Sequence, residues 1–116
     1  MTVNVNMLII VLAFIVVDLI IGIIKALATG TYKSLKMRDG LWHKLGEIMA
    51  VGFGVLCELS FPYVGINVNI PLVTTICVYI VLMETGSIIE NLAVISPNLQ
   101  KVLSKVFGDY KQDDDE

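Results

Sequence analysis

The sequence predicts an all-α integral membrane protein with three transmembrane helices, a short amphipathic C-terminal helix and assembly as a homo-oligomer. Apolar residues make up 56% of the 116 residues and charged residues only 16%, with a mean hydropathy of +0.81. Soluble domains contain about 45–50% apolar and about 25% charged residues. The apolar residues form three runs, near 7–28, 45–61 and 71–95, close to the ~20 residues that a helix needs to cross a bilayer.

The first two spans differ in quality. Span 7–28 is interrupted only by Asp18 and Lys25, and we expect residues 29–31 to end it. A polar, basic stretch follows, and Asp39 is the predicted N-cap of the helix that leads into span 45–61. That second span is short and carries two glutamates, so alone it also fits a re-entrant or interfacial segment.

The third span is long, and a short helix follows it. Pro71 stands at a favoured helix-start position, and Ser96-Pro97 pairs an N-cap candidate with proline at the first helical position. Beyond it, apolar residues recur on one face of the helix opposite lysines, which fits a helix lying in the membrane interface or packing on its own protein. We therefore divide the chain into a transmembrane domain, 1–95, and a cytoplasmic helix with an acidic tail, 96–116.

The charges predict an orientation. The connector between the first two spans is basic, whereas neither the connector between the second and third spans nor the start of the chain carries a charge. The positive-inside rule places the basic connector and the C-terminus in the cytoplasm and the N-terminus outside. The cations of this connector are Lys33, Lys36, Arg38 and Lys44.

Small and polar residues form stripes along the spans. Rows of small residues let membrane helices pack closely, and polar side chains bond across them. We expect these stripes to mediate helix packing and self-association or to line a pore. The candidate residues are Asp18, Gly22, Lys25, Ala26, Gly46, Ala50, Gly54, Glu58, Glu84, Ser87, Glu90 and Asn91.

Acids inside the spans are the most unusual feature. Glu84 lies roughly 20 Å in from Pro71 at 1.5 Å per residue, and carboxylates at such depth are disfavoured. We expect Lys25 to pair with Glu90 at similar depth, and we expect no cation at the depth of Asp18 or Glu84. The hypothesis is a switch, with neutral acids between packed helices in one state and hydrated acids lining an opening in another.

Residue types for other functions are missing from the sequence. It shows no Ser/His/Asp grouping, no glycine-rich phosphate loop and no metal-ligand spacing, so we expect no enzyme and no cofactor. The basic connector would meet anionic lipid headgroups before any nucleic acid.

Three segments carry a family resemblance. They are "DLIIGIIKAL" in the first span, "YKSLKMRDGLWHKLGE" in the connector, and "ETGSIIEN" with Pro97 following. Together they resemble the toxin-secretion/phage-lysis holins over about residues 15–100. The resemblance implies a phage- or prophage-encoded protein of the bacterial cytoplasmic membrane that oligomerises into lesions, which release an endolysin or export a toxin or bacteriocin.

Two other functions remain open from the sequence. The first is an antiholin, which would co-assemble with a holin and delay lysis. The second is a small oligomeric transporter or channel, in which the acids would be coupling sites.

Overall fold

The computed structural model describes residues 4–67 and 71–107, and every regular element in these ranges is helical. Three of the helices are long and apolar enough to cross a membrane, as the sequence predicts. The elements in chain order are α1 (Val5–Thr29), α2 (Ser34–Ser60), the 3-10 helix η1 (Phe61–Val64), α3 (Leu72–Ile95) and α4 (Pro97–Phe107). The acidic residues 113–116 lie outside the described ranges.

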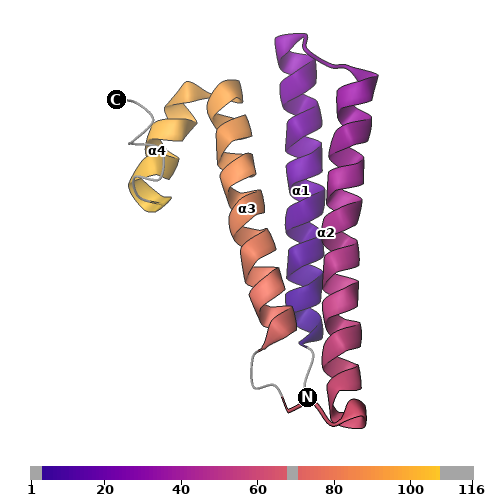
Figure 1. The fold of residues 1–116 in the computed structure, drawn as a ribbon. Helices are drawn as coiled ribbons and strands as arrows, with labels where there is room; N and C mark the ends of the chain where they lie inside the picture. Colours follow the sequence, from indigo (N-terminus) through magenta and orange to yellow (C-terminus); the bar gives the residue numbers. More distant parts are fainter. Residues whose placement is uncertain (1–3, 68–70, 108–116) are drawn as a thin grey trace, which may run out of the picture.

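The long helices run side by side (Figure 1), and α1 and α3 form the main contact. Val11 and Ile15 of α1 pack against Val73, Cys77 and Ile80 of α3 to make the buried apolar core. This core occupies the half of the bundle where α1 begins. Because the other half of the same interface holds polar side chains, the α1–α3 contact changes from apolar to polar along its length.

Local signals explain how α1 begins and ends. The Asn4 side chain accepts hydrogen bonds from the backbone of Asn6 and Met7, which caps the N-terminus. Gly30 has φ 68°, in the left-handed region that favours glycine, and its N–H closes the last turn. The sequence prediction that residues 29–31 end the helix is confirmed.

Helix α2 begins earlier than predicted. It starts at Ser34 after an extended Lys33, so the predicted N-cap at Asp39 is wrong and that residue lies inside the helix. The basic stretch after Ser34 is therefore helical and continuous with the apolar part. Polar residues in the first turns are compatible with a helix that emerges from a membrane. Because these turns are polar, hydropathy alone does not predict where the helix begins.

Helix α4 begins at Pro97, as predicted, and only Ser96 separates it from α3. It packs against α3 near the end of the bundle where α1 and α2 are joined (Figure 1). Val102 and Val106 remain exposed, so part of its apolar face stays available to a membrane surface.

Candidate functional site: an ion cluster inside the helix bundle

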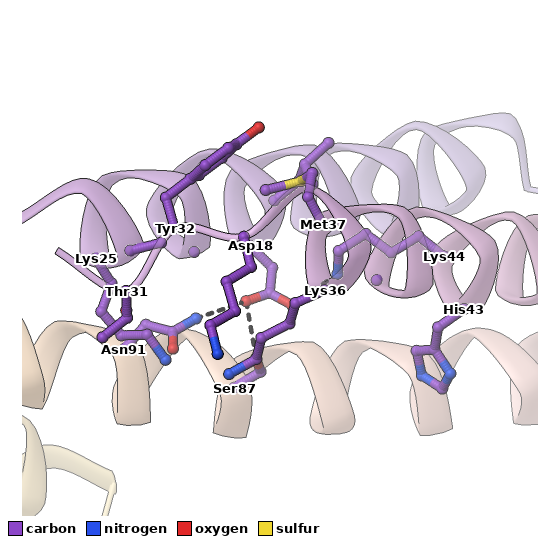
Figure 2. A pocket seen from close by; sticks show the side chains of 15 residues that line it. Asp18, Lys25, Thr31, Tyr32, Lys36, Met37, His43, Lys44, Ser87 and Asn91 are labelled. Atoms are coloured by element: carbon purple, nitrogen blue, oxygen red, sulfur yellow. Dashed lines mark hydrogen bonds and ion pairs between the residues drawn. The ribbon is translucent and has the colours of Figure 1, made fainter. Parts of the chain in front are cut away.

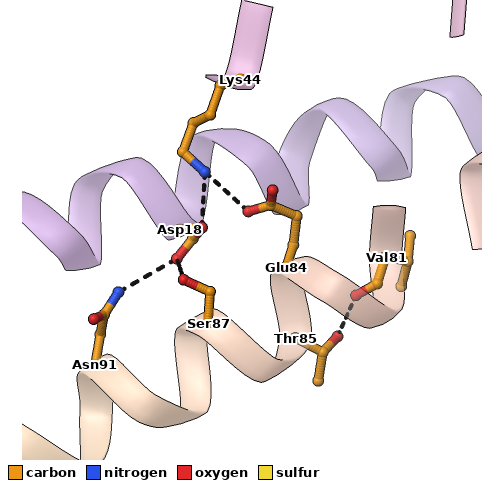
Figure 3. Close-up of polar contacts among 7 residues, drawn as sticks. All are labelled: Asp18, Lys44, Val81, Glu84, Thr85, Ser87 and Asn91. Atoms are coloured by element: carbon orange, nitrogen blue, oxygen red, sulfur yellow. Dashed lines mark hydrogen bonds and ion pairs between the residues drawn. The ribbon is translucent and has the colours of Figure 1, made fainter. Parts of the chain in front are cut away.

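One lysine of α2 joins the other two long helices. The Nζ atom of Lys44 lies 2.7 Å from Oδ2 of Asp18 in α1 and 3.0 Å from Oε2 of Glu84 in α3. Figure 3 shows the lysine reaching down between the two carboxylates. A single ammonium group therefore bonds carboxylates from both neighbouring helices, and we call this group with its hydrogen-bond partners the ion cluster.

Two further side chains of α3 complete the ion cluster. Ser87 donates a hydrogen bond from Oγ to Oδ1 of Asp18 at 2.9 Å, and Nδ2 of Asn91 approaches the same oxygen at 3.4 Å. Glu84, Ser87 and Asn91 are spaced by three and four residues, which places them on one face of a helix. Asp18 thus accepts bonds at both oxygens, one from α2 and the other from α3.

The three charged residues lie at the same depth. Lys44 is about 15 Å along α2 from its start at Ser34, counting 1.5 Å per residue. Asp18 is about 16 Å from the end of α1, and Glu84 is about 16 Å from the end of α3. These distances, counted from the same end of the bundle, put the three charged groups at one level, well inside the bundle.

This arrangement corrects the expectation that Asp18 and Glu84 have no cation at their depth. The apolar pattern of the sequence places Lys44 in a connector outside the second span, whereas α2 carries it a long way into the bundle. The physical reason is that the long lysine side chain also reaches sideways from the helix to the acids. A switch based on unpaired acids would first have to break these two ion pairs.

The ion cluster is well shielded. Asp18 is 6% exposed and Glu84 is 3% exposed, and the Lys44 side chain is 13% exposed. Removing one partner of a buried ion pair is strongly destabilising, since it leaves an uncompensated charge. The ion cluster can therefore hold three helices in one register. Separation of α2 from the other two helices would expose the carboxylates of Asp18 and Glu84 to lipid or water.

The match to known proteins agrees with the geometry. Residues 2–112 match the model of the bacteriophage holin family, whereas no curated protein and no solved structure gives a significant match. The chain belongs to the bacteriophage holin family. The family resemblance drawn from the three sequence segments is confirmed, and with its three apolar helices the chain is a holin-type membrane protein.

The small-residue row of α2 in this holin-family chain divides between two surfaces. A Cβ atom built on Gly54 would lie 2.8 Å from Cδ1 of Ile76, so this glycine permits close contact between α2 and α3. Gly46 has open space instead, and with Ala50 it lines a groove of about 620 Å³ between α2 and α3. Gly54 therefore serves packing within the chain, and the other two small residues leave a surface open.

Glu58, predicted to belong to the same row, has a different place in the holin-family fold. Its Oε1 atom accepts a hydrogen bond of 2.7 Å from the backbone N–H of Val73. Val73 lies in the first turn of α3, where N–H groups lack partners within the helix and a carboxylate is favourable. Glu58 thus caps α3 from α2. This role cannot be read from the sequence, because the two residues are far apart in the chain and meet only when α2 and α3 pack together.

Glu47 is a further polar residue inside the bundle, and it is not among the site residues predicted from the sequence. It lies one helical turn after Lys44 and lines the α2–α3 groove. Its Oε1 atom is buried and accepts no hydrogen bond from a residue that the structure describes, while its carboxyl group lies beside that of Glu84. The signal in the sequence that could have identified it is a glutamate within an apolar span, where an ionisable side chain is costly.

The remaining candidates lie toward the basic connector. Lys25, Gly22 and Ala26 line a cavity next to Asp18, and three connector lysines, Lys33, Lys36 and Lys44, line the same cavity. Arg38 is exposed and lies outside it. Glu90 is on the exposed side of α3, and its pairing with Lys25 stays a prediction.

Proposed function

We propose that the protein is a holin that accumulates in the bacterial cytoplasmic membrane and oligomerises into pores or lesions. These openings would release an endolysin, or export a toxin or bacteriocin, and so cause lysis of the host cell. The protein would lie with its N-terminus outside and its C-terminus inside. It would act without catalysis and without a cofactor, through contacts with copies of itself and with lipid.

The observation that carries this proposal is the incomplete packing of the α2–α3 groove. Gly46 and Ala50 contribute no large side chain to its wall, and the buried Oε1 atom of Glu47 accepts no hydrogen bond there from a described residue. In a membrane such an oxygen is costly; besides the neighbouring Glu84 carboxyl group, a donor from a second helix or water in a lumen would satisfy it. Assembly of several copies along the groove supplies one or the other.

The exposure of α2 supports the same conclusion. Gly54 is the one residue that α2 buries within the chain, among those the structure describes. Large apolar residues such as Trp42, Phe53 and Leu56 point outward. A helix in this state can exchange lipid neighbours for protein neighbours without losing contacts inside its own chain.

The test is inducible expression of the full chain in a bacterium that also produces a cytoplasmic reporter enzyme. After a delay, we expect an abrupt loss of viability together with release of the folded enzyme. Slow or absent lysis, with a delay imposed on a co-expressed holin, would identify an antiholin. Flux of a small solute without enzyme release would identify a channel, and both results would reject the proposal.

A matched pair of glycine variants tests the groove itself. Gly46 and Gly52 both lie in α2, and a Cβ atom at either would meet no neighbour within 4 Å, but only Gly46 lines the groove. Gly46→Leu should block assembly and abolish or strongly delay lysis at equal protein level, whereas Gly52→Leu should preserve it. Equal lysis by both variants would exclude the groove as the assembly surface.

A further inference from the structure

A second cavity, which we call the basic cavity, opens where α1 and α2 are joined. It has a volume of about 340 Å³ and is bounded by all three long helices. Four lysines line it, Lys25, Lys33, Lys36 and Lys44, against one carboxylate, that of Asp18. Figure 2 shows lysine side chains from α1 and α2 around Asp18, with Ser87 and Asn91 of α3 opposite.

Three of these lysines have no counter-ion among the residues that the structure describes. Lys44 is engaged by Asp18 and Glu84, but Lys25, Lys33 and Lys36 form no ion pair with any other described residue. The carboxylate in the cavity is already occupied by Lys44 and Ser87. The basic cavity therefore carries an excess of positive charge that nothing in the described chain neutralises.

The start of α2 adds to this positive field. Its N-cap residue, Lys33, makes no side-chain capping bond, and its first turn contains no acidic residue. The free N–H groups and the positive end of the helix dipole at such a terminus favour an anion. Lys36 and Met37, both from these first turns, line the cavity, so an anion bound there would lie close to the terminus.

The residues around the basic cavity indicate which kind of anion it would bind. The cavity joins a polar loop to membrane-capable helices, and Leu19 and Ala26 contribute apolar wall next to the lysines. Tyr32, also in the wall, is half-exposed, and tyrosine is frequent at the level of lipid headgroups. A phosphate group attached to an acyl-bearing glycerol would place its charge among the lysines and its chains along the helices.

We propose that the basic cavity binds the phosphodiester headgroup of an anionic membrane lipid. The headgroup phosphate would contact Lys25 and Lys36 and the first turn of α2, and the acyl chains would leave between the helices. The inference goes beyond pore formation and does not depend on it, because lipid binding is measured on the purified protein whether or not the protein lyses cells.

Native mass spectrometry of the full chain in a phosphate-free maltoside detergent provides the test. Phosphatidylglycerol and phosphatidylcholine are added at equal concentration, and the bound fraction of each is measured. The anionic lipid should be retained preferentially. Lys25→Gln and Lys36→Gln should each weaken its binding about fivefold, the effect of one lysine at a charged lipid surface.

Arg38→Gln is the matched control, since it removes a cation from the same stretch of α2 but outside the cavity. It should change phosphatidylglycerol binding less than twofold. An equal loss in the Arg38 and Lys36 variants, or equal retention of the two lipids, would overturn the proposal. A third arm adds inorganic phosphate: displacement of the lipid at equal concentration would overturn the lipid assignment in favour of a soluble phosphate.

Discussion

The ammonium group of Lys44 lies 2.7 Å from the carboxylate of Asp18, although the two residues come from different membrane-capable helices. Charge attraction grows as the surrounding dielectric constant falls. The pair therefore ties α2 to α1 inside the bundle, where both side chains are largely shielded. Glu84 extends the same link from α2 to α3.

Replacing Lys44 by methionine should destabilise the fold by about 3 kcal/mol, because Asp18 and Glu84 would lose their shared counter-ion. Unfolding in mixed micelles with increasing dodecyl sulfate measures the change. Lys36→Met, which removes a lysine without an ion pair to a described residue, should have little effect. Adding Asp18→Asn and Glu84→Gln to the Lys44 variant should recover most of the loss, and failure of this rescue would contradict an electrostatic cause.

Ser87→Ala should cost about 1 kcal/mol of unfolding free energy, since it removes a hydrogen bond to an ionised group between helices. Thr85→Ala serves as the control because the Thr85 hydroxyl bonds only the backbone of Val81 in its own helix. The same micelle titration compares them. A larger effect at Thr85 than at Ser87 would mean that the α1–α3 bond does not stabilise the bundle.

Gly54 should tolerate alanine but not valine. The alanine Cβ meets the mobile end of Ile76, whereas the branches of valine would press on Val73, whose Cα is 4.0 Å from that Cβ position. We expect Gly54→Val to lower stability by about 1–3 kcal/mol, as overpacking does. Gly52→Val, placed in open space on the same helix, supplies the baseline for the difference in helix propensity between glycine and valine.

Glu58→Ala should expose the amide of Val73 to exchange with solvent. The carboxylate accepts the hydrogen bond of that amide, and loss of a capping acceptor costs about 1 kcal/mol, equivalent to a several-fold faster exchange. Hydrogen–deuterium exchange of the peptide at the start of α3 reports the change. Glu58→Gln keeps a carbonyl acceptor and should retain most of the protection; unchanged exchange in the alanine variant would refute the cap.

Neutralising the acids should change the time at which lysis begins. Asp18→Asn or Glu84→Gln removes one attraction to Lys44, so α2 should separate more easily from the α1–α3 pair and lysis should start earlier. Optical density after induction, at matched expression, gives the onset. Lysis by both variants at the time of the unmodified protein would exclude a gating role for the ion cluster.

The sequence predicts the helices of this protein well where hydropathy dominates. The C-terminal end of α1 and the start of α4 follow from Gly30 and Pro97, whose backbone preferences act locally. The start of α2 does not follow, because residues 34–44 are polar enough to resemble a loop. Because the predicted start of α2 is too late, the position of Lys44 inside the bundle does not follow from the sequence either.

The candidate site was predicted in part for a related reason. Asp18, Glu84, Ser87 and Asn91 were selected as polar positions within apolar helices, and the structure brings all four together. Periodicity gives the face of one helix but not which neighbour covers it. The role of Glu58 at the start of α3 and the cation shared by two acids both depend on a second helix, which no single-helix pattern contains.

The order of the ion cluster along the chain has a consequence for biosynthesis. Asp18 leaves the ribosome first, Lys44 follows within the next helix, and Glu84 comes last. A hairpin of α1 and α2 can therefore enter the bilayer with the charges of Asp18 and Lys44 already paired. Helix α3 then brings a second carboxylate to an ammonium group that is already paired, and a chain cut before α2 would leave Asp18 without its counter-ion.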